Sequence, residues 1–170
     1  MIGLKRIPQL QDLEEAYGLL QSAARNQSVI APKKLALLSQ WTRFDPRLGE
    51  QLVSHLGQSW RKLEPLNLNK ELCRQPWPPA MGVILLKVLN YSITKSNRPL
   101  FKQWTSLVMQ GIKPACNEQF FIGLRSLGGP LMLEDVLRSH KSYRRWGYFG
   151  REHLLNKADY TLAIRHKKDN

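Results

Sequence analysis

The sequence has few cysteines and no long apolar run. Cys73 and Cys116 are the only cysteines among 170 residues and lie 43 positions apart, which excludes a disulfide scaffold and a closely spaced zinc motif. The longest apolar run, Ala80 to Leu86, covers seven residues, whereas a membrane-spanning helix needs about 20. Residues 1–8 contain no apolar core of a secretory signal. We therefore expect a protein of the cytoplasm, or of the nucleoid or nucleus if it binds nucleic acid, without membrane association and with both cysteines buried as small hydrophobic residues.

Known catalytic and cofactor-binding motifs are absent as well. The sequence contains no Gly-rich phosphate loop, dinucleotide fingerprint, His-Glu-x-x-His pair or Gly-x-Ser-x-Gly elbow. Its four histidines, His55, His140, His153 and His166, are isolated from one another, and the positive charge around the last three opposes a metal ion. We therefore expect no cofactor, no metal and no catalysis, with His55 on the surface of its helix.

One enzymatic alternative stays open. A small nuclease or transferase would need a general acid or base next to a phosphate-binding cation. His153 with Arg145 or Arg151 could supply that pair in a ribonuclease.

Apolar residues recur every three or four positions along most of the chain, which is the period of an amphipathic helix. The pattern predicts an all-α fold: a compact multi-helix bundle of about seven helices in a single domain, residues 1–170. Local signals place several boundaries. Asp45-Pro46 predicts the start of a helix that runs to Leu63, and Asn67 is expected to cap the next. The Pro-rich elbow at 76–79 is a candidate hinge between possible subdomains 1–75 and 80–170.

Beyond the elbow, residues 80–95 are apolar on nearly every side, which predicts a central buried helix. A helix opened by Pro99 is expected to bury a stripe of Leu100, Trp104, Leu107, Val108 and Gly111. Three further helices are predicted over 117–127, 130–145 and 151–168, and no strand is expected.

The net charge is the composition's most unusual feature. Lys and Arg number 26 and Asp and Glu 13, so the net charge is +13. The second half carries most of it, and the segment Arg138–Lys168 alone holds nine cations and two acids. Such crowding costs self-repulsion unless an anionic partner binds.

The same segment mixes aromatic rings with its arginines. Arginine holds phosphate through paired hydrogen bonds, and aromatic rings stack on unpaired bases. We therefore predict a non-catalytic nucleic-acid-binding subunit or accessory factor, for DNA or RNA. The expected nucleic-acid-binding residues are Arg138, Lys141, Arg144, Arg145, Trp146, Tyr148, Arg151 and Lys157, with Phe149 as a further ring. An equally simple interpretation buries Tyr143, Trp146 and Phe149 as one core face and leaves the arginines outside.

Two other interpretations remain. The chain is alternatively a protein-interaction module, similar in role to an antitoxin or a complex subunit, that docks on an acidic protein through an apolar patch. That patch would include Trp77, Phe120, Phe121 and Met132. A weaker pattern is a DNA-reading helix-turn-helix formed by Lys33–Trp41 and the Asp45 helix, whose start presents Arg47, Glu50, Gln51 and Ser54.

Overall fold

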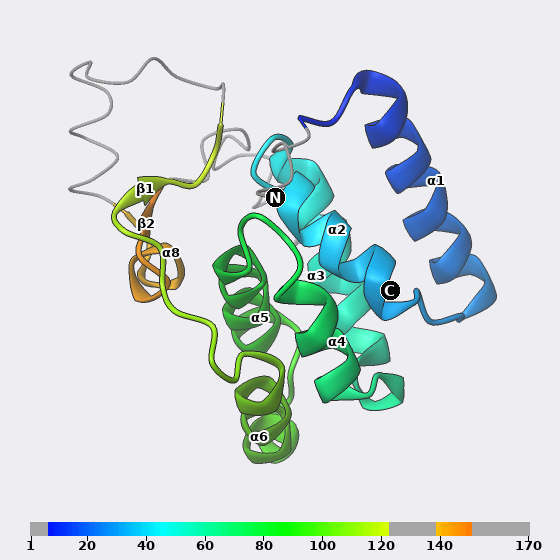
Figure 1. The fold of residues 1–170 in the computed structure, drawn as a ribbon. Coiled ribbons are helices and arrows are strands. Elements are labelled where there is room, and N and C mark those ends of the chain that lie inside the picture. The colour runs from blue at the N-terminus through cyan, green and yellow to red at the C-terminus, as the bar shows by residue number, and fades with distance from the viewer. Residues whose placement is uncertain (1–6, 123–138, 151–170) are drawn as a thin grey trace, which may run out of the picture.

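A computed structural model describes residues 7–122 and 139–150 (Figure 1). In this part of the chain the helices are α1 (Leu10–Asn26), α2 (Pro32–Trp41), α3 (Pro46–Ser59), α4 (Pro65–Leu72), α5 (Pro79–Tyr91), α6 (Arg98–Val108) and α8 (Lys141–Arg145). Two 3₁₀ turns, η1 (Trp60–Lys62) and η2 (Lys95–Asn97), and two short strands, β1 (Glu118–Gln119) and β2 (Tyr148–Phe149), complete them. The predicted all-α multi-helix bundle is confirmed. No helix among the described residues is both long enough and apolar enough to cross a membrane.

Proline and side-chain caps set the helix starts. The Asp45 carboxylate accepts the Arg47 backbone N–H at 2.9 Å, and Pro46 opens α3, as the sequence predicts. The cap of α4 was predicted wrongly: it is Glu64, whose carboxylate accepts the N–H groups of Leu66 and Asn67. Helix α4 therefore begins at Pro65, two residues before the predicted cap.

The main core lies between helices α1 to α6. Its centre is α5, whose Met81, Ile84, Leu85 and Val88 are no more than 1% exposed. The prediction of a central buried helix is confirmed, although α5 ends at Tyr91 rather than at residue 95. Helix α1 packs across α3, and the Tyr17 hydroxyl donates to the Asp45 carboxylate at 2.6 Å. In Figure 1, α1 therefore lies at one side of the bundle, and α8 with both strands lies at the other.

The Pro-rich elbow is fixed to α2. The Trp77 N–H donates to the side-chain oxygen of the buried Gln40 at 2.8 Å. The main core cluster includes residues from both sides of the elbow, such as Leu52 and Met81. The elbow as a hinge, with subdomains 1–75 and 80–170, stays a prediction.

The buried face of α6 differs from the predicted stripe. Phe101, Trp104 and Val108 are buried, whereas Leu100 and Leu107 are 55% and 43% exposed. Helix α6 is therefore rotated about its axis relative to the prediction. The cause is Trp60, whose ring packs against those of Phe101 and Trp104 at centroid distances of 5.3 and 6.0 Å. The larger rings gain more from this burial than the two leucines would.

A second, smaller core joins α5 to β1, β2 and α8. It consists of Ala80, Val83, Phe120, Phe121, Tyr143 and Tyr148. The two strands are parallel, with Glu118 opposite Tyr148 and Gln119 opposite Phe149. The predicted helix over 117–127 is therefore wrong at its start: Asn117 has a left-handed φ of 53°, and the chain is extended after it. In extended chain, neighbouring side chains point to opposite sides, which allows Phe120 and Phe121 both to be buried.

The predicted helix over 130–145 is interrupted. Ser139 and His140 are not helical, and α8 begins at Lys141 with His140 as its cap, because the His140 Nδ1 accepts the Ser142 N–H at 3.3 Å. The structure does not describe residues 123–138 and 151–170. The rest of this predicted helix, the end of the predicted 117–127 helix and the whole predicted 151–168 helix lie in those ranges.

Three smaller expectations are also wrong. Cys73 and Cys116 are both exposed free thiols rather than buried hydrophobic residues. His55 was expected at the surface but is 8% exposed, because α1 covers this side of α3. Its Nε2 accepts the backbone N–H of Ile30 over a long 3.5 Å.

Candidate functional site

Helix α8 carries three of the predicted phosphate-binding residues, and its inward side fixes it to the second core. Tyr143 is fully buried, with its ring centroid 5.1 Å from that of Phe120 and 5.9 Å from that of Phe121. The Lys87 ammonium of α5 donates to the Tyr143 hydroxyl at 2.9 Å and lies 4.9 Å from the centre of its ring. The backbone of α8 is thus held by a ring that cannot turn outward.

Lys141, Arg144 and Arg145 point the other way. All three side chains are exposed. Within the described residues, no carboxylate forms an ion pair with any of them. Arg144 and Arg145 lie in the last turn of α8, where positive charge is favourable for the helix dipole. The interpretation that buries Tyr143, Trp146 and Phe149 and leaves the arginines outside is thus met at Tyr143, whereas Trp146 and Phe149 are half-buried.

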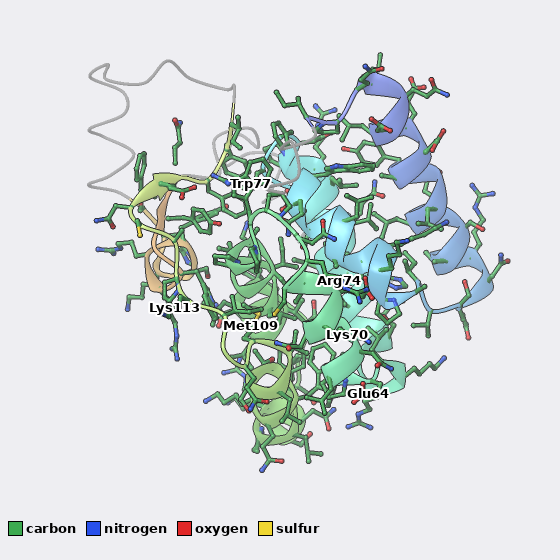
Figure 2. All side chains as sticks on the ribbon, viewed as in Figure 1. Glu64, Lys70, Arg74, Trp77, Met109 and Lys113 are labelled. Atoms are coloured by element: carbon green, nitrogen blue, oxygen red, sulfur yellow. The ribbon has the colours of Figure 1, made fainter. Side chains whose placement is uncertain are left out.

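Trp146 follows α8 directly and is half-buried against α5. A Cβ on Gly82 would lie only 2.1 Å from an indole atom, so the indole packs on bare backbone. The Trp146 carbonyl accepts the Ala115 N–H at 2.9 Å, which brings the segment after α6 beside the end of α8. That segment carries the exposed Lys113, on the same side of the molecule as α8 in Figure 2.

Tyr148 lies in the second core and not at the surface. It is 2% exposed, and the Arg43 guanidinium lies 4.9 Å from the centre of its ring. Burial raises the pKa of the Tyr148 hydroxyl to about 12, because the phenolate would be desolvated. Its ring faces are covered in this structure, whereas Phe149 next to it is half-buried.

Arg43, at the end of α2, connects the two cores. Its Nε donates to the Phe120 carbonyl at 3.0 Å and its Nη2 to the Gln119 carbonyl at 2.7 Å. Nη2 also lies 3.4 Å from the carboxylate of Glu118, and the Arg43 carbonyl accepts the N–H of Ile122 at 2.7 Å. Trp77 covers the guanidinium at 4.7 Å. Burial lowers the pKa of this side chain, yet its role is structural: it positions β1, against which β2 and then α8 are placed.

From Arg61 onward, the described part of the sequence is strongly positive. Between Arg61 and Gly150, the described residues carry twelve cations and three acids. Each of the three acids has a local partner. Glu64 caps α4, Glu71 pairs with Arg74 at 2.8 Å and Glu118 pairs with Arg43. The remaining exposed cations are therefore weakly compensated, which favours an anionic partner.

Sequence reasoning missed Lys113 as a neighbour of the exposed α8 cations and Lys87 as the partner of Tyr143. Both are single cations in otherwise uncharged stretches, so no local pattern singles them out. Only the packing of α5 against α8, and the bond from Ala115 to Trp146, reveal their position. Three of the predicted nucleic-acid-binding residues lie outside the described residues: Arg138, Arg151 and Lys157. His153, the predicted general acid or base of the enzymatic alternative, lies outside them as well.

The helix-turn-helix alternative meets an obstacle at α3. Gln51 and Ser54, two of its expected base-reading residues, line a hollow together with Leu20, Gln21 and Ala24 of α1. A recognition helix needs that side open to enter a DNA groove. Within the described residues there is also no group of three His, Cys, Asp or Glu side chains arranged to hold a metal ion.

Comparison with known proteins found no similar sequence or structure. No family model matches the chain, and no curated protein and no solved structure matches it either.

Proposed function

We propose that this chain is a non-catalytic nucleic-acid-binding module that contacts phosphates through the α8 surface, formed by Lys141, Arg144, Arg145 and Lys113. The observation that carries the proposal is the orientation of α8. Tyr143 is fully buried while both neighbouring arginines are exposed without a carboxylate partner among the described residues. Arg138, Arg151 and Lys157 belong to the same proposal from the sequence alone.

The packing of α8 supports phosphate binding energetically. A flexible basic segment loses conformational entropy when it binds, whereas a helix already held by packing loses less. Tyr143, Trp146 and the His140 cap hold this short helix before any ligand arrives. Its arginines then need only to order their own side chains.

Base stacking is expected to contribute less to the affinity than phosphate contact does. Tyr148 is buried beneath Arg43, so the stacking role passes to the half-buried Trp146 and Phe149. Phosphate contact therefore supplies most of the expected affinity. Such binding is strongly dependent on salt, since log K falls by about 0.9 per log unit of salt for each phosphate neutralised on duplex DNA.

The test is binding to single- and double-stranded DNA and RNA by fluorescence anisotropy across a salt series. Arg144→Glu/Arg145→Glu is compared with Lys33→Glu/Lys34→Glu, which makes the same change in net charge at two exposed, adjacent lysines at the start of α2. We expect the α8 variant to lose more affinity and to have a shallower salt dependence than the α2 variant. Equal losses in the two variants, or no binding to any probe at low salt, would overturn the proposal.

A second candidate is docking on an acidic protein, and one observation favours it. The predicted patch of Trp77, Phe120 and Phe121 is buried, and Met132 lies outside the described residues. Three other apolar side chains are exposed instead, Leu66 of α4 and Leu100 and Leu107 of α6. Helices α4 and α6 are joined by the Asn69 amide, which donates to the Val108 and Gln110 carbonyls.

Lys70, labelled on α4 in Figure 2, is one helical turn after Leu66, and Arg61 donates to the side chain of Asn97, the residue before α6. An acidic partner with an apolar anchor would match such a surface. Leu100→Ser/Leu107→Ser separates the two functions, because it should leave nucleic-acid affinity unchanged while reducing docking of a protein partner.

A location in the cytoplasm or nucleoid accompanies both candidates. The two exposed thiols, Cys73 and Cys116, are unpaired in the structure. Free thiols of this kind are maintained in reducing compartments.

A further inference from the structure

A groove between α1 and α3 lies apart from the α8 surface and consists of two adjoining hollows. The first has a volume of about 210 Å³ and the second about 190 Å³. Both are lined by Ala24 of α1 and by His55 and Gln58 of α3. Each is smaller than the roughly 300 Å³ at which typical small-molecule pockets begin. A ligand that extends through both therefore fits better than one confined to either.

The first hollow presents hydrogen-bond donors. Gln27, Ser28 and Lys62 line it, along with Ala23 and Ser59. Ser59 donates its own hydroxyl proton to the His55 carbonyl at 2.8 Å, so it offers only lone pairs to a ligand. The Lys62 ammonium, the Ser28 hydroxyl and the glutamine amides remain as donors.

His55 lines both hollows, and a hydrogen bond fixes the tautomer of its ring. Because its Nε2 accepts the Ile30 N–H, the proton of the neutral ring resides on Nδ1. Burial lowers the pKa of His55, which keeps the ring neutral at pH 7. No carboxylate lines either hollow. This end of the groove therefore suits an anionic group.

The second hollow is less polar. Leu20, which is 3% exposed, and Ala24 line it together with Gln21, Gln51, Ser54, His55 and Gln58. An aliphatic chain that lies over Leu20 and Ala24 would leave water and gain the usual hydrophobic free energy. Lys62 and Ser28 line only the first hollow and Leu20 lines only the second, so the groove suits a ligand with an anionic end and an apolar end.

We propose that the α1–α3 groove binds a short aliphatic carboxylate, with its carboxylate at Lys62 and His55 and its chain over Ala24 and Leu20. This site is independent of the nucleic-acid proposal, since none of its residues belongs to the α8 surface. Each methylene that enters the second hollow should raise the affinity about fourfold, the equivalent of about 0.8 kcal/mol. The increase should stop once the hollow is full.

The experiment follows the imidazole signals of the full-length protein, labelled at histidine, by NMR. His55→Gln identifies the His55 signal among the four. Acetate, butyrate and hexanoate are titrated at constant ionic strength, with hexylammonium as a probe of opposite charge. We expect saturable shifts at His55, tighter binding along the carboxylate series and no response to hexylammonium.

Three variants make the result specific. Ala24→Phe fills both hollows from an exposed position of α1 and should abolish the shift. Lys62→Gln should weaken hexanoate about tenfold, whereas Lys70→Gln, an exposed lysine of α4, should not. Nucleic-acid affinity should be the same in Ala24→Phe as in the unmodified chain, so the two proposals can fail separately.

The proposal is overturned by any of three results. These are the absence of saturation with hexanoate at millimolar concentration, equal shifts with hexylammonium, or equal weakening by Lys62→Gln and Lys70→Gln.

Discussion

The indole of Trp146 occupies the space that a side chain on Gly82 would need. A Cβ at residue 82 would lie 2.1 Å from Cε2 and 2.4 Å from Nε1 of the indole. Real contacts of a Cβ are never this short, so α8 can approach α5 at this point only because residue 82 is glycine. The position of the proposed phosphate-binding surface thus depends on a missing side chain in the most buried helix.

Gly82→Ala should displace Trp146 and destabilise the fold. The methyl group favours the helix by about 1 kcal/mol, but overpacking against a ring typically costs about 1–3 kcal/mol. We expect a net loss of about 1 kcal/mol in urea unfolding and a red shift of the tryptophan emission. The matched control is Gly18→Ala in α1, where nothing lies within 4 Å and the protein should gain about 0.5–1 kcal/mol. A Gly82→Ala protein as stable as the Gly18→Ala protein would contradict the packing described here.

Gly147→Ala tests the approach of the α8 end to Ala115. Gly147 has a φ of +71°, and a Cβ there would lie 1.8 Å from the Ala115 carbonyl oxygen. Gly111 has nearly the same φ of +74° with nothing within 4 Å, so Gly111→Ala introduces the backbone strain alone. Strain of this kind costs about 1–2 kcal/mol. We expect Gly147→Ala to lower the thermal midpoint clearly more than Gly111→Ala does. Equal decreases of the thermal midpoint in the two variants would show that the contact between Gly147 and the Ala115 backbone is not retained.

Arg43→Lys should destabilise the protein by about 3 kcal/mol in urea unfolding. A lysine cannot reproduce the donors that Arg43 directs at two carbonyls and a carboxylate, and its ammonium would be buried with fewer partners. The conservative control is Arg47→Lys at an exposed position of α3, which should stay within about 0.5 kcal/mol of the unmodified protein. Arg43→Lys should also weaken nucleic-acid binding indirectly, by loosening the strands that place α8.

Stability should decrease below neutral pH because of His55. Burial lowers its pKa in the folded state, so the unfolded chain binds the proton more readily. The contribution of the neutral ring is therefore complete above about pH 6.5 and is lost as the pH falls below that value. Thermal unfolding between pH 8 and pH 5 should show this loss. His55→Gln should show a smaller decrease over the same range, whereas an unchanged decrease would assign it to other groups.

The parts of the fold that local chemistry dictates were predictable. Asp45-Pro46 starts α3, and the apolar residues after Pro79 form the buried α5, because caps and periodicity act within a few residues. The buried face of α6 was not predictable in the same way. Helix α6 has two neighbouring apolar stripes that share Trp104. One also contains Leu100 and Leu107, and the other contains Phe101 and Val108. Only the position of Trp60 decides between them.

The second core depends on contacts that no local pattern contains. Arg43 bonds to Phe120 across 77 positions, and a lone arginine in a sequence is ordinarily expected at the surface. The strands are two residues long, too short to leave an alternating pattern. At the candidate site, the exposure of Arg144 and Arg145 agrees with the expected charge pattern. The burial of Tyr148 depends on Arg43 and could not be read from its neighbours.

The bond between Arg43 and the β1 carbonyls sets an order for folding during synthesis. Every buried residue of the main core precedes position 110, whereas β2, which pairs with β1, begins at Tyr148. As the chain emerges from the ribosome, helices α1 to α6 can therefore assemble while the Arg43 guanidinium is still hydrated. We expect dehydration of that charge to wait until the Phe120 N–H donates to the Phe149 carbonyl and the extended segment is fixed. We therefore expect the α8 surface to be the last described part to form, on a bundle that is already complete.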